Sequence, residues 1–250
     1  MTKIVVANWK MNPQSQREAE VLFKETLFLA NSVKKAKIII CPPFPYLFIC
    51  GKLKNRKVFL GAQNTSKEEG GSHTGEVSPK MLSSMGVSFS IVGHGEERSR
   101  GETNKLINEK ILNLLKFKLS PILCVGESIR DKEGMYLSFV EGQIRECLSG
   151  VPKAQMKNII IAYEPIWAIG ASATREATCE EFMEMKIFIK KVISDIYDAK
   201  IAHSIPILYG GSVNSQNAHI FMSDGCADGL LVGRDSLQPK KFGAILSSIN

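Results

Sequence analysis

The chain has 250 residues, of which 44% are hydrophobic and 23% are charged. This composition excludes collagen-like, disordered and coiled-coil proteins, and the length allows a large buried core. The 32 basic and 25 acidic residues give a net charge of +7 with the histidines neutral. A positive protein attracts anionic small substrates, phosphates included.

The sequence predicts neither a nucleic-acid site nor a metal site. The densest basic run, Lys52 to Lys57, contains no aromatic residue and is typical of a solvated helix end and loop. The six cysteines form no C-x-x-C pair and lie at no zinc-binding distance from a histidine. Scattered cysteines favour a reducing compartment, and neither a signal peptide nor a membrane span fits the sequence. We therefore expect a cytoplasmic protein without a membrane partner.

Short apolar runs rich in β-branched residues recur along the chain, with helix patterns between them. They are nearly continuous rather than alternating, as expected for parallel strands that are covered on both faces. The eight runs are Ile4–Ala7, Ile38–Cys41, Val58–Ala62, Phe89–Gly93, Ile122–Val125, Ile159–Tyr163, Ile207–Tyr209 and Leu230–Val232.

Helix signals fill the segments between these runs. Capping boxes are expected at Ser15-x-x-Glu18 and Thr178-x-x-Glu181, and Ser78-Pro79 with Gly86 marks a short helix. No linker or low-complexity segment interrupts the alternation. The pattern predicts an α/β protein, a single-domain (β/α)8 barrel over residues 1–250. An open doubly wound sheet in two domains remains the alternative.

Polar residues stand directly after the predicted strands. Because all strands of such a barrel point the same way, these residues meet on one rim, where barrel active sites are found. Each of them alone is typical of a solvated or hydrogen-bonded loop, but their convergence indicates a site. They are Asn8, Lys10, Gln63, Asn64, His94, Glu127, Glu164, Gly210, Gly211, Ser212, Gly233 and Arg234.

Two loops on this rim suggest a lid and an anion site. Residues 165–174 form a longer connection than the usual 2–6 residues between a strand and a helix, which favours a lid. Gly210, Gly211 and Ser212 stand directly before an expected helix start, where free N–H groups favour an anion. A second glycine turn follows at Gly233, and the loops after strands seven and eight are the habitual phosphate site of this barrel.

Several segments, taken together and in order, resemble the triosephosphate isomerase family. They are Asn8-Trp9-Lys10-Met11-Asn12, Gly93-His94, Ala162-Tyr163-Glu164-Pro165-Ile166-Trp167-Ala168-Ile169-Gly170, Tyr209-Gly210-Gly211-Ser212-Val213 and Gly229-Leu230-Leu231-Val232-Gly233. The resemblance implies interconversion of dihydroxyacetone phosphate and D-glyceraldehyde 3-phosphate by a homodimer, with no cofactor or metal. It places the chain in glycolysis and gluconeogenesis, with a link to the pentose phosphate pathway.

The resemblance also implies residue roles. Glu164 is the expected base, His94 acts as a neutral imidazole, and Lys10 and Asn8 stabilise the enediolate intermediate. Phosphate contacts are expected from Gly170, Ser212, Gly233 and the backbone of Arg234. The expected lid and support residues are Pro165 and Trp167 in the lid, Glu127 and Tyr209 as its anchors when closed, Glu96 beside Lys10, and Thr74 on the dimer loop.

The sequence departs from the family pattern at four places. Gly95 stands where a serine that contacts the catalytic glutamate is usual, and Glu97 replaces a basic residue. Ala171-Ser172-Ala173 replaces a common Thr-Gly-Lys, with a small insertion near Arg175 and Glu176, and Arg234 replaces a glycine. The glycine at position 95 leaves the resting contact of Glu164 open.

Two alternative functions follow from weighing these features. A phosphate-binding barrel with weak activity and a binding or adhesion role would be favoured only by the changes at Gly95, Glu97 and the lid tip Ala171-Ser172-Ala173. Another phosphate-binding barrel enzyme, of an indole or phosphoribosyl pathway, would share the phosphate loops but not the set of Asn8, Lys10, His94 and Glu164. That set favours the isomerase.

Overall fold

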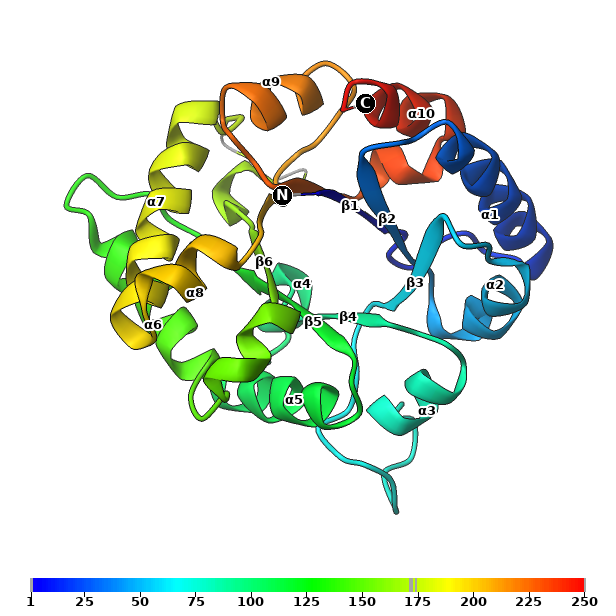
Figure 1. The fold of residues 1–250 in the computed structure, drawn as a ribbon, viewed down its shortest axis with the longest axis horizontal. Helices are drawn as coiled ribbons and strands as arrows, with labels where there is room; N and C mark the ends of the chain where they lie inside the picture. The colour runs from blue at the N-terminus through cyan, green and yellow to red at the C-terminus, as the bar shows by residue number, and fades with distance from the viewer. Residues whose placement is uncertain (1, 171–172, 174, 250) are drawn as a thin grey trace.

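The computed structural model describes residues 2–170, 173 and 175–249. Over these residues eight parallel strands close into a barrel in sequence order, with the first strand paired to the last (Figure 1). This closure confirms the predicted (β/α)8 barrel and excludes the open doubly wound sheet. The strands are β1 (Lys3–Asn8), β2 (Ala36–Cys41), β3 (Val58–Ala62), β4 (Phe89–Val92), β5 (Ser120–Val125), β6 (Ile160–Tyr163), β7 (Ile207–Tyr209) and β8 (Gly229–Val232).

The strand ends differ from the predicted runs by at most two residues. β2 and β5 begin earlier because backbone pairing continues past the apolar run, with Ala36 beside Lys3 and Ser120 beside Phe89. β4 ends one residue early because Gly93 has a φ of +69°, which leaves the extended region.

Helices surround the barrel as an outer layer (Figure 1). The α-helices are α1 (Gln16–Asn31), α2 (Leu47–Leu53), α3 (Pro79–Ser84), α4 (Gly95–Ser99), α5 (Asn104–Lys116), α6 (Met135–Cys147), α7 (Cys179–Ile196), α8 (Ala199–Ser204), α9 (Ala218–Ser223) and α10 (Pro239–Ser247). The 3-10 helices are η1 (Phe44–Tyr46), η2 (Lys153–Asn158), η3 (Ile166–Ala168) and η4 (Arg234–Leu237).

One of the two predicted capping boxes is complete. At α7 the Thr178 hydroxyl accepts the N–H of Glu181, and the Glu181 carboxylate accepts the N–H of Thr178. At α1 the Ser15 hydroxyl accepts the N–H of Glu18, but the Glu18 carboxylate accepts the N–H of Gln14 instead. The second half of that predicted box is therefore wrong, because the carboxylate reaches one residue beyond the cap.

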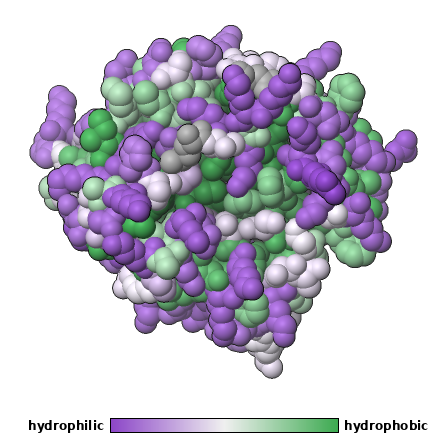
Figure 2. All heavy atoms as spheres, in the orientation of Figure 1, coloured by the Kyte–Doolittle hydropathy of each residue, from purple (hydrophilic) through white to green (hydrophobic). Residues whose placement is uncertain are grey.

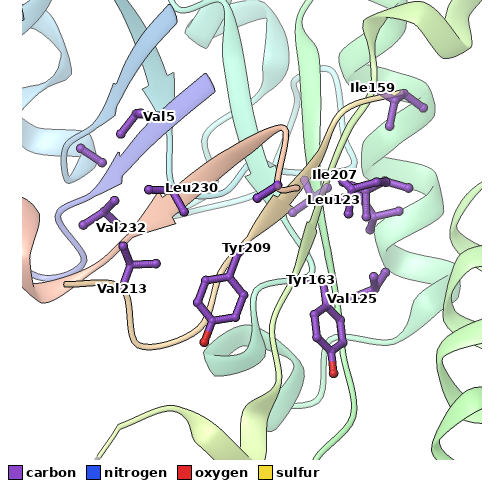
Figure 3. Close-up of a cluster of buried hydrophobic side chains, with 14 of the residues drawn as sticks. Val5, Leu123, Val125, Ile159, Tyr163, Ile207, Tyr209, Val213, Leu230 and Val232 are labelled. Atoms are coloured by element: carbon purple, nitrogen blue, oxygen red, sulfur yellow. The ribbon is translucent and has the colours of Figure 1, made fainter. Parts of the chain in front are cut away.

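Alternate side chains of each strand enter two separate apolar layers. Ile4 and Val6 of β1 face the barrel interior, while Val5 and Ala7 face the helices. Figure 3 shows part of the outer layer, with Val5 on β1 and the rings of Tyr163 and Tyr209 on neighbouring strands. Because both faces are buried, the strands read as continuous apolar runs.

Most of the charged residues lie on the surface, and the buried ones include Lys110, Glu127 and Glu164. The basic run from Lys52 to Lys57 is exposed at its charged positions, at the end of α2 and the following turn, as predicted. Hydrophilic side chains cover much of the face shown in Figure 2, with apolar ones between them. No helix among the described residues is long and apolar enough to cross a membrane. Over the same residues, no group of three or more metal-ligating side chains comes together.

Candidate active site

A cavity of about 600 Å³ opens where the strands end. Its lining comes from the segments that follow β1, β4, β6, β7 and β8, which is the rim predicted from the sequence. The predicted site residues that line it are Asn8, Lys10, His94, Glu96, Glu164, Gly170, Gly210, Gly211, Ser212, Gly233 and Arg234. Further lining residues, to which the sequence analysis assigned no role, include Asn12, Ile169, Glu176 and Leu231.

Lys10 is held in an uncommon backbone conformation on this rim. Its φ is +52°, and its N–H donates to the Asn8 side-chain oxygen at 3.0 Å. The Gln63 amide donates to the Lys10 carbonyl at 2.8 Å. The Lys10 ammonium lies 2.6 Å from a carboxylate oxygen of Glu96. Partial burial raises the pKa of that carboxyl, but the hydrogen bond and charge of Lys10 outweigh it and lower the pKa. The ammonium is thus tethered at the cavity.

The side chains of His94 and Glu164 lie in contact inside the cavity. The Nδ1 atom of His94 accepts the N–H of Glu96 at 3.2 Å, so a neutral ring carries its proton on Nε2. That Nε2 atom lies 3.2 Å from Oε1 of Glu164. The second carboxylate oxygen, Oε2, accepts the N–H of Gly95 at 3.0 Å. The resting contact of Glu164, left open by the loss of the serine, is therefore made by backbone.

Glu164 is only 3% exposed, and small residues make room for it. A Cβ on Gly126 would overlap the Glu164 carbonyl, and one on Gly210 would lie 3.0 Å from its Cγ. The Cys124 thiol also lies against it. Burial, and then the charge of and hydrogen bond to Glu164, raise the pKa of Cys124 well above its ordinary range. From the sequence, Cys124 is expected only as part of the buried strand Ile122–Val125. Its place near the rim end of β5, facing the barrel interior, is the signal that could have indicated this contact.

The predicted lid residue Trp167 is anchored from two sides. Its indole N–H donates to Oε1 of Glu127 at 2.7 Å, and the Arg175 guanidinium lies 4.4 Å from its ring. The same Glu127 oxygen accepts the Tyr163 hydroxyl at 2.7 Å and a guanidinium N–H of Arg130 at 3.4 Å. Sequence reasoning missed Tyr163, Arg130 and Arg175 in this network, although each lies within a few residues of a predicted site position.

The remaining lid and anchor residues lie outside the cavity lining. Pro165 precedes η3, and the Tyr209 ring stacks on Phe221 with centroids 3.6 Å apart. Of the predicted lid tip, Ala171, Ser172 and Thr174 lie outside the described residues. Thr74 is exposed on a loop that projects from the barrel beside α3 (Figure 1), so it is not brought to the cavity.

The expected phosphate end differs from the prediction in one respect. The helix after β7 starts only at Ala218, so the N–H groups of Gly211 and Ser212 belong to a loop rather than to a helix start. The Ser212 hydroxyl donates to the carbonyl of Ala168 at 2.9 Å, which joins this loop to η3. Arg234 is exposed at the cavity, and no ion pair or hydrogen bond with the described residues engages its guanidinium.

The fold and this rim define a (β/α)8-barrel enzyme whose cavity, lined among others by the Glu164 carboxylate, the His94 imidazole and two cations, suits a small anionic substrate. The sequence model of the family described as triosephosphate isomerase matches residues 3–249. The chain belongs to the triosephosphate isomerase family.

Individual relatives agree with this assignment over their full length. A protein named triosephosphate isomerase from Dictyoglomus thermophilum is 42% identical over 98% of this chain and 99% of its own. Those of Aquifex aeolicus and Clostridium botulinum are 43% and 40% identical, covering 99% and 98% of this chain and 100% and 99% of their own. The chain is therefore an aldose–ketose isomerase that interconverts dihydroxyacetone phosphate and glyceraldehyde 3-phosphate in glycolysis.

Proposed function

We propose that Glu164 moves a proton between adjacent carbons of the triose phosphate, while His94 transfers protons to and from the two substrate oxygens. The carbon next to a carbonyl is a weak acid, so a base must act together with a proton donor to the oxygen. Glu164 takes the carbon-bound proton, and the Nε2–H of His94 donates to the carbonyl oxygen, which gives an enediol-type intermediate. The proton on Glu164 then returns to the neighbouring carbon. At the same time Nε2 of His94 takes the proton from the other substrate oxygen, so that the new carbonyl forms there and both side chains regain their starting protonation states. The observation that carries this proposal is the pairing of His94 Nε2 with Glu164 at 3.2 Å.

Lys10 and Asn8 supply charge stabilisation in this scheme. Negative charge develops on the substrate oxygens, and a positioned ammonium stabilises it without reorganising at the moment of reaction. Asn8 fixes the Lys10 backbone through the bond at 3.0 Å, and Glu96 holds its ammonium.

At the other end of the cavity, the N–H groups of Gly170, Ser212, Gly233 and Arg234 are proposed to bind the substrate phosphate. The positive φ of Gly170, +76°, favours glycine in the turn that leads toward this end. The guanidinium of Arg234 adds a second positive charge near the phosphate, since no acidic partner engages it within the described chain. A cation and several N–H groups suit an anionic phosphate.

The segment from Pro165 onward is proposed to close over the substrate, with Trp167 moving along with it. Glu127 and Tyr209 are the proposed anchors of the closed form. Closure excludes water, which strengthens the electrostatic contacts and keeps the intermediate from expelling its phosphate. The bond between Ser212 and the Ala168 carbonyl supports this idea, because it links the phosphate loop to the moving segment.

Isomerisation in D2O tests the proton-transfer scheme directly. Dihydroxyacetone phosphate is converted in D2O with an excess of a coupling dehydrogenase, which traps the aldehyde product before it returns. We expect deuterium at carbon 2 of a substantial fraction of the product by NMR, because a protonated Glu164 exchanges with solvent. A product that carries no deuterium at carbon 2 would show that the transferred hydrogen does not exchange with solvent and would contradict this expectation.

We further propose a homodimer. Three large apolar side chains are exposed on the consecutive βα units after β1, β2 and β3: Met11 at 83%, Phe48 at 60% and Met81 at 55%. The Thr74 loop projects from the barrel beside α3, the helix that carries Met81 (Figure 1). Glu97, which replaces a basic residue, is balanced within its own chain by Arg100 at 2.6 Å and Asn64 at 3.1 Å. An apolar surface with a projecting loop suits burial against a second copy.

Light scattering after gel filtration tests the dimer. We expect a mass of twice 27.6 kDa for the wild-type chain and a shift toward the monomer for Thr74→Arg, which places a bulky charge in the proposed interface. A wild-type chain that is monomeric at assay concentration and fully active would contradict the proposal.

A cytoplasmic location, a single domain over residues 1–250 and independence of any cofactor remain part of the proposal. All six cysteines are free and four of them are buried, which suits a reducing compartment. The alternative role in binding or adhesion gains no specific support from the site.

A further inference from the structure

The space beside Gly95 is filled by a side chain from the lid hinge. A Cβ built on Gly95 would lie 2.5 Å from Cδ1 of Ile166, far inside the separation of about 3.5–4.0 Å at which two carbons touch. The same Cβ would lie 3.9 Å from Oε2 of Glu164, which is an ordinary contact. A side chain at position 95 would therefore require the end of the Ile166 side chain to move, whereas the base itself leaves room for it.

Both partners of this contact are tied to Glu164. The Gly95 N–H donates to the Glu164 carboxylate at 3.0 Å. Ile166 follows Glu164 by two residues, and Pro165 between them restricts the backbone. The N–H of Ile166 donates to the carbonyl of Glu127 at 3.0 Å, which fixes the hinge. Ile166 is thus connected to Glu164 in two ways. The chain joins their backbones directly, and the Ile166 side chain contacts Gly95, whose N–H binds the Glu164 carboxylate.

Ile166 does not line the cavity, so its action on substrate is indirect. We propose that Ile166 is a positioning residue for Glu164. The Ile166 side chain packs on Gly95 and holds the Gly95 N–H against the Glu164 carboxylate. Its apolar end also keeps water from that hydrogen bond. Glycine at position 95 is what permits the contact. This inference rests on the proposed role of Glu164 as the base.

A double-mutant cycle of Gly95→Ala and Ile166→Val tests the contact. The first change adds only a Cβ and forces Cδ1 of Ile166 away, and the second removes Cδ1. We expect Gly95→Ala to lower kcat about tenfold with KM within about twofold of wild type, the size of effect that contacting residues commonly show. In the double variant kcat should recover to within about threefold of wild type, because the methyl group then has room.

Two results of this cycle would overturn the inference. An unchanged kcat in Gly95→Ala, or equal losses from Gly95→Ala with and without Ile166→Val, would mean that Ile166 does not position the base. Gly142→Ala is the matched control, since Gly142 lies in α6 and a Cβ added there would meet nothing within 4 Å outside its own helix. Its kcat should match wild type.

Two further variants keep the result interpretable. If Gly95→Ala fails to fold by circular dichroism, Ile166→Ala should lower kcat with KM unchanged, and a wild-type kcat there would overturn the inference. Glu164→Gln is measured alongside. If that variant stays active, the proposed base is wrong, whereas an inactive Glu164→Gln with an additive cycle overturns only the role of Ile166.

Discussion

We expect Glu164→Gln to lower kcat by about 10³- to 10⁴-fold, the upper part of the range for losing general base catalysis. The amide keeps the size of the side chain and an oxygen that can accept the Gly95 N–H, which lies 3.0 Å from the carboxylate in the wild-type chain. It cannot take a proton from carbon. Because the side chain is buried and keeps this hydrogen bond, the variant should remain folded. The measurement is a coupled assay of glyceraldehyde 3-phosphate conversion with thermal melting as the folding check.

The control for charge loss is Glu146→Gln, an exposed glutamate on α6 that does not line the cavity. Its kcat should equal that of wild type. Glu164→Gln should also lose the exchange of the substrate carbon-bound hydrogen with D2O, since the group that would exchange is gone. A folded Glu164→Gln variant that keeps more than about a tenth of wild-type kcat would assign the proton transfer to another group.

The positions of Glu164 and His94 could be predicted because of where apolar runs end. In a barrel, the first polar residue after a buried strand must lie on the carboxyl-end rim, and β6 ends at Tyr163 directly before Glu164. The pattern of apolar runs in the sequence, each followed by polar residues, therefore locates the site. The chemistry of the pair came from the resemblance to a family, because spacing alone does not distinguish a base from a solvated glutamate.

The contacts of these residues could not be predicted in the same way. Tyr163 and Arg130 meet at Glu127 through strand pairing and loop paths that no local sequence pattern encodes. For Gly95, the sequence indicated a lost serine contact, while the structure supplies the backbone N–H instead. A backbone donor is present at every non-proline residue, so only three-dimensional geometry shows which one is used.

Replacing each of the two cavity cations, Lys10 and Arg234, by methionine should affect different kinetic constants. We expect Lys10→Met to lower kcat/KM about 10³-fold, because it removes a preorganised charge at the reacting oxygens. Glu96 loses its partner, but its side chain is 52% exposed, so solvent screens the remaining charge and the fold persists. Circular dichroism melting checks that persistence.

Arg234→Met is the matched comparison, since it removes a cation from the phosphate end of the same cavity. We expect KM to rise about three- to tenfold with kcat within about twofold of wild type, because binding is lost equally from the ground and transition states. Inorganic phosphate should inhibit this variant more weakly than wild type for the same reason. An unchanged KM and unchanged inhibition by phosphate would mean that Arg234 contributes only its backbone N–H. A Lys10→Met variant whose kcat/KM stays within tenfold of wild type would contradict the proposed role of Lys10. If the expected results for Lys10→Met and Arg234→Met are both found, the charge beside the reacting carbon sets the rate and the charge beside the phosphate sets the affinity.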